Sequence, residues 1–209
     1  LEMRIGDLCQ QARQGGLAYA RRPPEDHRVQ SALLQRLAQR LAEALPGASF
    51  VGLDRAADGG AAVRARLDAD PAHKARVEAS LAVLLADGAV DSPALITLLA
   101  VLEADDGAIP VIDMLEQGLD AASQEAVIAH LRRRGPEARP LFFLTRSNAI
   151  LDLDAVGDDE AIILCPANHS LPICVRPIPG AVGYEAVATC LASPEVRTRT
   201  EGMVAWLPS

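Results

Sequence analysis

Aromatic residues and lysine are scarce in this chain, and each shortage excludes something. Phenylalanine, tyrosine and tryptophan make up 3% of the 209 residues, although half of all residues are hydrophobic. The core must therefore be built from alanine, leucine, valine and isoleucine. Lys74 is the single lysine among 20 basic residues. Any mechanism that needs a lysine amine must use this residue or be abandoned.

Long hydrophobic runs and an excess of positive charge are also missing. No run approaches the roughly 18 apolar residues of a membrane-spanning helix, so we expect no membrane span and no signal peptide. The formal net charge of −8 argues against nucleic acid or an anionic membrane surface as the main partner.

The four cysteines are spaced irregularly, which is typical of free thiols in a reducing cytoplasm. Cys165, His169 and Cys174 lie near one another in the sequence, but they lack paired spacing and a fourth ligand. A zinc site needs both. We therefore expect a cytoplasmic protein with no metal and no other cofactor.

The order of patterns predicts three regions. Residues 1–60 form a helical extension, 61–193 a larger domain and 194–209 a tail. Within the extension, the apolar residues of Val29–Leu45 recur at helical spacing up to Pro46–Gly47, so an amphipathic helix is expected there. This helix either packs on its own domain or mediates a homodimer.

From residue 62 onward, short apolar runs alternate with helical patterns. Strands are predicted at five runs: Ala62–Leu67, Ala89–Val90, Ile109–Asp113, Leu141–Thr145 and Ala161–Leu164. Helices are predicted between and after them: Ala72–Ala86, Ser92–Glu103, Ala121–Arg134 and Ile150–Val156. Other candidate elements are a strand at Phe50–Leu53, a strand at Leu171–Val175 and a helix at Val182–Leu191. The alternation predicts an α/β fold with a doubly wound, parallel, five-stranded sheet.

Polar residues follow four of the predicted strands: Asp68 and Asp70, Asp113, Thr145, and Cys165. Because the carboxyl ends of parallel strands meet at one edge of a sheet, these side chains are expected to share a pocket. Asp70 precedes Pro71 and is also suited to cap the next helix.

Four stretches carry a resemblance to a known family: RLDADPAHK, VIDMLEQGLD, FFLTRSN and GDDEAIILCP. In residue types and spacing they resemble the receiver domain of two-component response regulators, the CheY-like fold, over about residues 60–170. The resemblance implies strand order 2-1-3-4-5, with Asp113 at the phospho-acceptor position. Two positions depart from the family: Ala69 replaces a metal-binding acid, and Cys165 replaces the invariant lysine.

These departures imply a pseudo-receiver that is not an enzyme. It would act as an interaction or regulatory module for another protein of a bacterial signalling or secretion assembly. Without the lysine, Asp68 and Asp113 would repel each other across the pocket, and the pKa of each would be raised.

A second resemblance competes with the first. The stretch VIDMLEQGLDAAS, followed by LFFLTRS, is similar to the Walker B and D-loop region of ABC-type ATPases. The catalytic glutamate of that family would fall at Met114 and its switch histidine at Arg146. Since no GxxxxGK[ST] occurs in the chain, this resemblance implies a degenerate ATPase half that serves as a structural partner.

A third reading comes from a short motif. Arg4 with Asp7, and Arg55 with Asp58, fit the RxxD pattern that holds cyclic-di-GMP in inhibitory sites. A chain rich in arginine and aspartate also produces such matches by chance. A cyclic-di-GMP-binding regulatory domain is therefore the third alternative.

Overall fold

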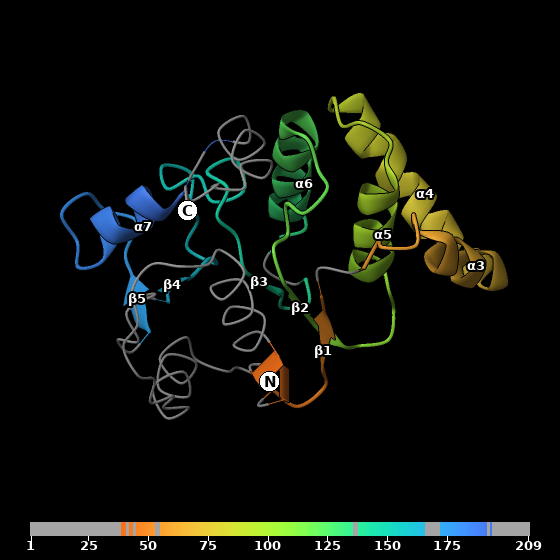
Figure 1. Ribbon diagram of the computed structural model, residues 1–209, viewed down its shortest axis with the longest axis horizontal. Helices are drawn as coiled ribbons and strands as arrows, with labels where there is room; N and C mark the ends of the chain where they lie inside the picture. The colour runs from red at the N-terminus through yellow and green to blue at the C-terminus, as the bar shows by residue number, and fades with distance from the viewer. Residues whose placement is uncertain are drawn as a thin grey trace, which may run out of the picture. The chain divides into compact units, whose positions relative to one another are not determined.

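The structure, a computed structural model, describes residues 39–40, 42–43, 45–52, 55–135, 138–165, 172–191 and 193. The chain divides into two compact units. We call Ala38–Leu151 with Ala192–Ser209 the sheet unit, and Leu1–Leu37 with Asp152–Leu191 the hairpin unit. Figure 1 labels the elements of both. Domain boundaries after residues 60 and 193 stay a prediction.

A parallel three-stranded sheet forms the base of the sheet unit, in the order β1-β2-β3. The strands are β1 (Ala48–Val51), β2 (Ile109–Ile112) and β3 (Phe142–Phe143). Central strand β2 is buried from Pro110 onward, as its unbroken apolar sequence predicts for a strand in a parallel sheet. The predicted central strand is confirmed, and its neighbours overlap the strands expected at Phe50–Leu53 and Leu141–Thr145.

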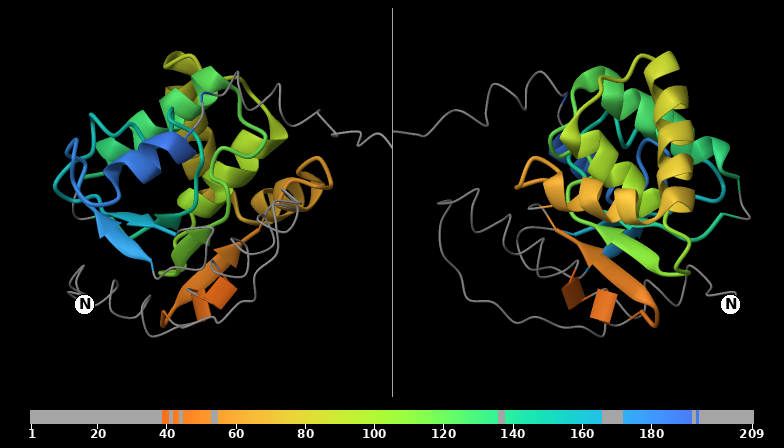
Figure 2. Two further views of the ribbon diagram at one scale, coloured as in Figure 1. Left: turned by 60° about the vertical axis from the view of Figure 1, so that its left-hand side comes forward. Right: turned by 90° about the vertical axis from the view of Figure 1, so that its right-hand side faces the viewer.

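Four helices of the sheet unit lie on one side of these strands in the views of Figure 2. They are α3 (Ala61–Ala69), α4 (Pro71–Ala86), α5 (Pro93–Leu102) and α6 (Ala121–Arg133). The side chains of Asp70, Ser92 and Asp120 cap the last three by accepting the N–H three residues ahead, at 2.8–3.1 Å. Aliphatic side chains fill the core between helices and sheet, including Leu84, Leu95, Leu98, Leu99, Ile112, Leu115 and Val127.

The strand predicted at Ala62–Leu67 is wrong, because these residues form helix α3. Val63 and Leu67 are buried four residues apart, whereas Arg64 and Arg66 between them are exposed. A strand inside a doubly wound sheet would have buried both arginines without partners, at a high cost. The helix leaves them in solvent, which decides the conformation.

Other predicted elements differ as well. Ala89–Val90 is not a strand, and Ile150–Val156 forms turns rather than a helix. The sheet of the described residues has three parallel strands rather than five, so the five-stranded doubly wound sheet is not confirmed. The mixed α/β class itself holds.

The hairpin unit contains β4 (Ile162–Leu164), β5 (Ile173–Val175) and α7 (Tyr184–Cys190). The two strands pair antiparallel, with Ile163 opposite Cys174. The predicted strand Ala161–Leu164 is therefore confirmed as a strand, but it pairs in a separate sheet. The strand and helix expected near Leu171–Val175 and Val182–Leu191 are also present.

The expectation of four free thiols is wrong for Cys174, which is disulfide-bonded. Cys165 and Cys190 are free thiols. In the part of the chain that the structure describes, no helix is long and apolar enough to cross a bilayer. The amphipathic helix predicted at Val29–Leu45 lies mostly outside the described residues, so dimerisation through it stays a prediction.

Candidate functional site

Asp113 stands at the carboxyl end of β2 and is almost completely buried, with 1% of its surface exposed. Its N–H donates to the carbonyl oxygen of Val51 at 2.9 Å, which continues the β1–β2 ladder. Neither carboxylate oxygen has a hydrogen-bond partner among the described residues. Burial raises the pKa of this carboxyl, while the charge of Arg55 lowers it and that of Glu116 raises it.

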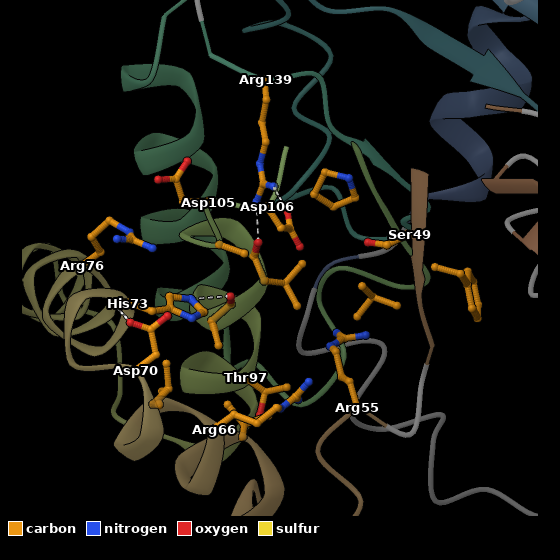
Figure 3. A pocket seen from close by; sticks show the side chains of 18 of the residues that line it. Ser49, Arg55, Arg66, Asp70, His73, Arg76, Thr97, Asp105, Asp106 and Arg139 are labelled. Atoms are coloured by element: carbon orange, nitrogen blue, oxygen red, sulfur yellow. Dashed lines mark hydrogen bonds and ion pairs between the residues drawn. The ribbon is translucent and has the colours of Figure 1, made fainter. Parts of the chain in front are cut away.

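Arg55, labelled in Figure 3, lies in the turn after β1 and brings positive charge to Asp113. Its guanidinium donates to the carbonyl oxygens of Asp113 and Met114 at 2.8 Å each, and to that of Leu115 at 3.2 Å. Longer contacts reach the carbonyls of Gly52 and Gln117. One side chain therefore holds the whole loop that follows the central strand. Burial lowers the pKa of this arginine, and the neighbouring acids oppose that shift.

The loop held by Arg55 is strained at one residue. Met114 has φ +48°, the left-handed region, and is the one non-glycine residue of the described part with positive φ. Such a conformation costs about 1–2 kcal/mol for an L-residue. The hydrogen bond from Arg55 to its carbonyl offsets part of that cost.

The carboxyl ends of β2 and β3 are joined by hydrogen bonds. The N–H of Leu144 donates to the carbonyl oxygen of Ile112 at 2.9 Å, and the N–H of Leu115 donates to the carbonyl oxygen of Leu144 at 3.0 Å. Buried Glu116 accepts the N–H of Arg146 at 3.0 Å through Oε1. The acidic loop after β2 and the loop after β3 therefore form one connected structure.

Helix α6 is tied to the same loops through buried polar side chains. Ser147 Oγ donates to Gln124 Oε1 at 2.6 Å, and Gln124 Nε2 donates to the carbonyl of Leu119 at 2.9 Å. Thr145 Oγ1 accepts the N–H of Ser147 at 3.0 Å. The threonine hydroxyl predicted for the site is thus engaged in a local turn.

The predicted acid pocket does not form around Asp113. Asp68 lies exposed on α3 and pairs with Lys74 at 2.6 Å, and Asp70 caps α4 as the sequence predicted. Neither is among the groups that shift the pKa of Asp113. The pKa of Asp113 is raised, as predicted, but the predicted cause is wrong. Burial raises it, and not repulsion from Asp68. Cys165 belongs to the hairpin unit, where burial raises the pKa of its thiol.

The second RxxD motif is also used within the fold. Arg55 binds the carbonyls after β2, and Asp58 accepts the N–H groups of Gly60 at 2.9 Å and Ala62 at 2.7 Å at the start of α3. These bonds hold the pKa of Asp58 below its usual value. Arg4 and Asp7 lie outside the described residues.

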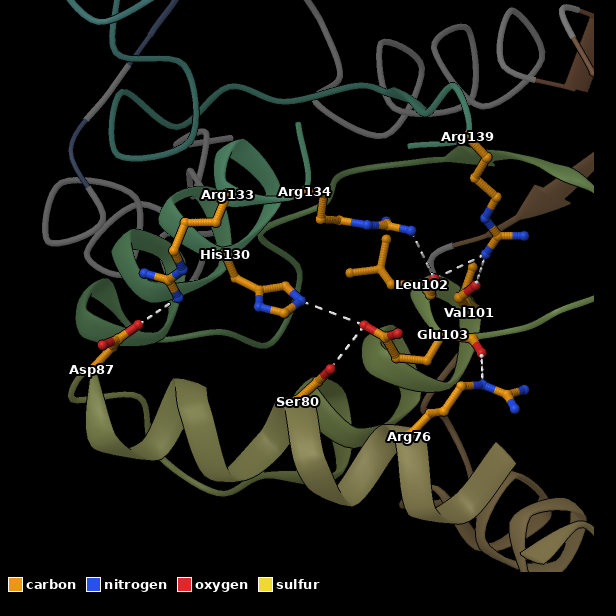
Figure 4. A network of polar contacts seen from close by, with 10 residues as sticks. All are labelled: Arg76, Ser80, Asp87, Val101, Leu102, Glu103, His130, Arg133, Arg134 and Arg139. Atoms are coloured by element: carbon orange, nitrogen blue, oxygen red, sulfur yellow. Dashed lines mark hydrogen bonds and ion pairs between the residues drawn. The ribbon is translucent and has the colours of Figure 1, made fainter. Parts of the chain in front are cut away.

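A second polar cluster lies where α5 ends (Figure 4). Ser80 Oγ donates to Glu103 Oε1 at 2.9 Å, and His130 Nε2 lies 3.4 Å from the same oxygen. The bond from His130 is the main cause that lowers the pKa of Glu103. Since the serine bonds to the carboxylate rather than to the histidine, this is not the arrangement of a serine nucleophile activated by a base.

The chain matches no protein-family model, no curated protein and no solved structure. Function must therefore be argued from the site. In the described ranges, no three or more histidine, cysteine, aspartate or glutamate residues are grouped so that they could hold a metal ion. Sequence reasoning singled out Asp113 but missed Glu116 and the role of Arg55 there. A second acid three residues after a strand-end acid was the available signal for Glu116.

Proposed function

We propose that this chain is a non-catalytic, ATPase-like domain that acts as a structural or regulatory partner of another protein. The observation that carries the proposal is the connected end of β2 and β3. The stretch similar to a Walker B and D-loop region runs from a central parallel strand through Asp113 into a turn and α6. The next strand leads to Arg146, whose N–H is bonded to Glu116 of that turn.

The chemistry of the site favours a non-catalytic role. Hydrolysis of a nucleotide needs a carboxylate that Mg²⁺ can reach and a base that positions water. The carboxylate of Asp113 is buried beside a guanidinium, and Met114 stands where the resemblance places the base. The sequence also lacks a phosphate-binding loop of the GxxxxGK[ST] type. What is retained is a hydrogen-bonded junction of the loops after β2 and β3, a surface that another protein could bind.

A pseudo-receiver is the second candidate, because one observation favours it. Asp113 and Thr145 follow two paired parallel strands, as the acceptor and hydroxyl positions of a receiver do. Asp68 and Asp70 weigh against it, since both belong to the helical segment α3–α4 rather than to a loop after a strand. In either case the expected partner is another protein of a signalling or secretion assembly.

Two assays on the intact chain test the proposal. With ATP and Mg²⁺, we expect no phosphate release above that of the Asp113→Asn variant; release that this substitution abolishes would contradict a non-catalytic role. With acetyl phosphate and Mg²⁺, intact-mass analysis should show no adduct of about 80 Da, the mass of one phosphoryl group. An adduct absent from Asp113→Asn would favour a working receiver instead.

The proposal includes a cytoplasmic location, as expected from the sequence. The disulfide bond of Cys174 argues against that location, because disulfides are rare in the cytosol. Rapid alkylation of freshly lysed cells, followed by mass spectrometry, would show whether Cys174 is a free thiol in the cell. Alkylated Cys174 is expected for a cytoplasmic protein, whereas protection until reduction would place the chain in an oxidising compartment.

A further inference from the structure

Strand β1 lies at an edge of the parallel sheet, because the described strands follow the order β1-β2-β3. An edge strand presents backbone N–H and carbonyl groups that no neighbouring strand uses. Native proteins usually protect such an edge with charged side chains, proline or a bulge. The sequence of β1, ASFV, contains no charge and no proline, and its register with β2 is continuous. The strand itself therefore has no protection against pairing with another extended segment.

The hydrogen bonds to β2 show which groups of β1 point outward. The carbonyl oxygens of Gly47 and Val51 accept N–H groups at the two ends of β2, each at 2.9 Å. In a parallel pair, every second residue of a strand bonds to the same neighbour. The backbone groups of Ala48, Phe50 and Gly52 therefore point away from β2.

Two of the outward groups are used locally. The N–H of Ala48 donates to the carbonyl oxygen of Leu45 at 3.1 Å, and the carbonyl oxygen of Gly52 accepts from Arg55 at 3.3 Å. The carbonyl of Ala48, both groups of Phe50 and the N–H of Gly52 bond to no residue that the structure describes. Four groups in this order match two residues of an added parallel strand, each of which donates one hydrogen bond and accepts one.

A second copy of this chain fits the edge less well. Two copies related by a two-fold axis would pair their β1 strands antiparallel, so that facing residues exchange both of their hydrogen bonds. Phe50 can do so, but Ala48 has already used its N–H and Gly52 its carbonyl oxygen. A parallel segment of a different protein uses all four groups.

A cavity of about 630 Å³ lies between β1 and helices α3, α4 and α5 (Figure 3). All four residues from Ser49 to Gly52 line it. Because side chains of a strand alternate between the faces of a sheet, every second side chain of an added strand would point to the side of the helices. The cavity gives those side chains room beside β1.

The charge of this cavity favours acidic side chains. Its lining contains four arginines against three aspartates, whereas the chain as a whole has a formal net charge of −8. Asp70 and Asp106 already accept hydrogen bonds within the fold, and Arg66 pairs with no described residue. The arginines are spread along the cavity and do not meet at one point (Figure 3). This arrangement suits an extended segment that carries acids at intervals, and not a single compact anion.

We propose that the outer edge of β1 holds an extended, acidic segment of a partner protein as a fourth parallel strand. Backbone hydrogen bonds to Phe50 and its two outward-facing neighbours hold the segment, and acidic side chains beside the cavity give specificity. This inference deepens the proposed function, on which it rests for the partner being a protein. It makes no use of the Asp113 carboxylate, so the assays on Asp113→Asn and those on the edge can fail separately.

Amide hydrogen exchange of the full chain, read residue by residue by NMR, tests the edge without any ligand. The N–H groups of Phe50 and Gly52 should exchange faster than those of Ser49 and Val51, which bond to β2. Equally slow exchange at all four residues would mean that another part of the chain already covers the edge, and would overturn the proposal.

Peptide display supplies the probe for binding. Random peptides of about ten residues, the upper length of a common strand, are selected on the full chain, and the enriched peptides are synthesised and titrated. They should be rich in aspartate and glutamate. Phe50→Pro removes the outward N–H at an edge where proline is tolerated, and should weaken binding about tenfold or more. Phe50→Val keeps that N–H and is the matched control.

A charge reversal tests the acidic character without touching the strand. Arg66→Glu should weaken the enriched peptides, and it should fold normally because Arg66 is exposed and has no described partner. Arg64→Glu is its control, since Arg64 is exposed on the same helix but does not line the cavity.

Four results of these binding experiments would overturn the proposal and leave the non-catalytic role standing. They are no enriched peptide, equal binding to Phe50→Pro and Phe50→Val, equal weakening by Arg64→Glu and Arg66→Glu, and a wild-type dimer that Phe50→Pro converts to a monomer. The last result would assign the edge to a second copy of the chain.

Discussion

Replacing Arg55 tests whether one guanidinium holds the loop after the central strand. Arg55→Met keeps the length of the side chain and removes its charge and donors. Three short bonds are lost, at 2.8, 2.8 and 3.2 Å. Each hydrogen bond from a charged donor contributes about 1.5–3 kcal/mol, but bonds of one group are not additive. Removing one partner of a buried charge cluster costs about 3–5 kcal/mol, and we expect a loss in that range.

The loss should depend on pH, because Asp113 and Glu116 stay behind. Burial already raises the pKa of Asp113, and removing Arg55 takes away the charge that lowers it most. The ionised carboxylate therefore becomes still less favourable at neutral and alkaline pH. As the pH falls through the folded-state pKa of Asp113, the acid becomes neutral and this part of the loss disappears. Arg55→Met should be less harmful at about pH 4 than at about pH 8.

Urea denaturation at both pH values measures the effect, supported by thermal melting. For a chain of this size, 3–5 kcal/mol corresponds to a fall in Tm of roughly 6–20 °C. Arg64→Met, on exposed α3, is the matched control and should change little. The double variant with Asp113→Asn should be more stable than the sum of the single changes predicts. A loss below about 1 kcal/mol, or one independent of pH, would refute the reasoning.

Three further predictions concern single residues. Asp113→Asn should raise Tm at alkaline pH by a few degrees (about 1 kcal/mol). Because the folded-state pKa of Asp113 is raised, the wild type loses stability as the pH rises through that pKa. A lower Tm of the variant at pH 8 would contradict this. Glu103→Gln should lower the free energy of unfolding by about 1 kcal/mol near neutral pH, measured by urea titration. Because the folded-state pKa of Glu103 is lowered, the stability that its carboxylate contributes vanishes as the pH falls through that pKa. A loss that persists in acid would count against this reasoning. Gly118→Ala should cost about 1–3 kcal/mol, because φ is +76° and the new Cβ would stand 2.8 Å from Ala94 Cβ. Gly107→Ala has similar φ but open space, so an equal cost in both would contradict the steric part.

Local pattern sufficed for the elements whose signals lie within a few residues. The apolar run ending in Asp113 predicted the central strand, and Asp70 before Pro71 predicted a capped helix. Burial of a continuous apolar run and capping of free N–H groups are decided by neighbours in sequence. These parts of the fold follow from the sequence for that reason.

Segment 62–67 shows where local pattern fails. Val63, Ala65 and Leu67 alternate as in a strand, yet Val63 and Leu67 are also four residues apart as on a helix face. Both periods fit so short a stretch. The fold decides for the helix: Ala65 is exposed together with Arg64 and Arg66, whereas a strand would place Ala65 on the same buried face as Val63 and Leu67. Non-local contacts also separate β4 from the main sheet. Its apolar sequence predicted a strand, but not that this strand would pair with β5 rather than with β1, β2 or β3.

The surroundings of Asp113 were decided by the tertiary structure alone. The sequence placed an acid at a strand end and suggested Asp68 as its neighbour. The fold instead brings Arg55 to its carbonyl from 58 residues away, with Glu116 close by. The sequence shows which residues can ionise, but burial and non-local contacts set their pKa values and their partners. The strand and its acid were therefore determined by the sequence itself, whereas the charge balance around that acid exists only in the folded chain.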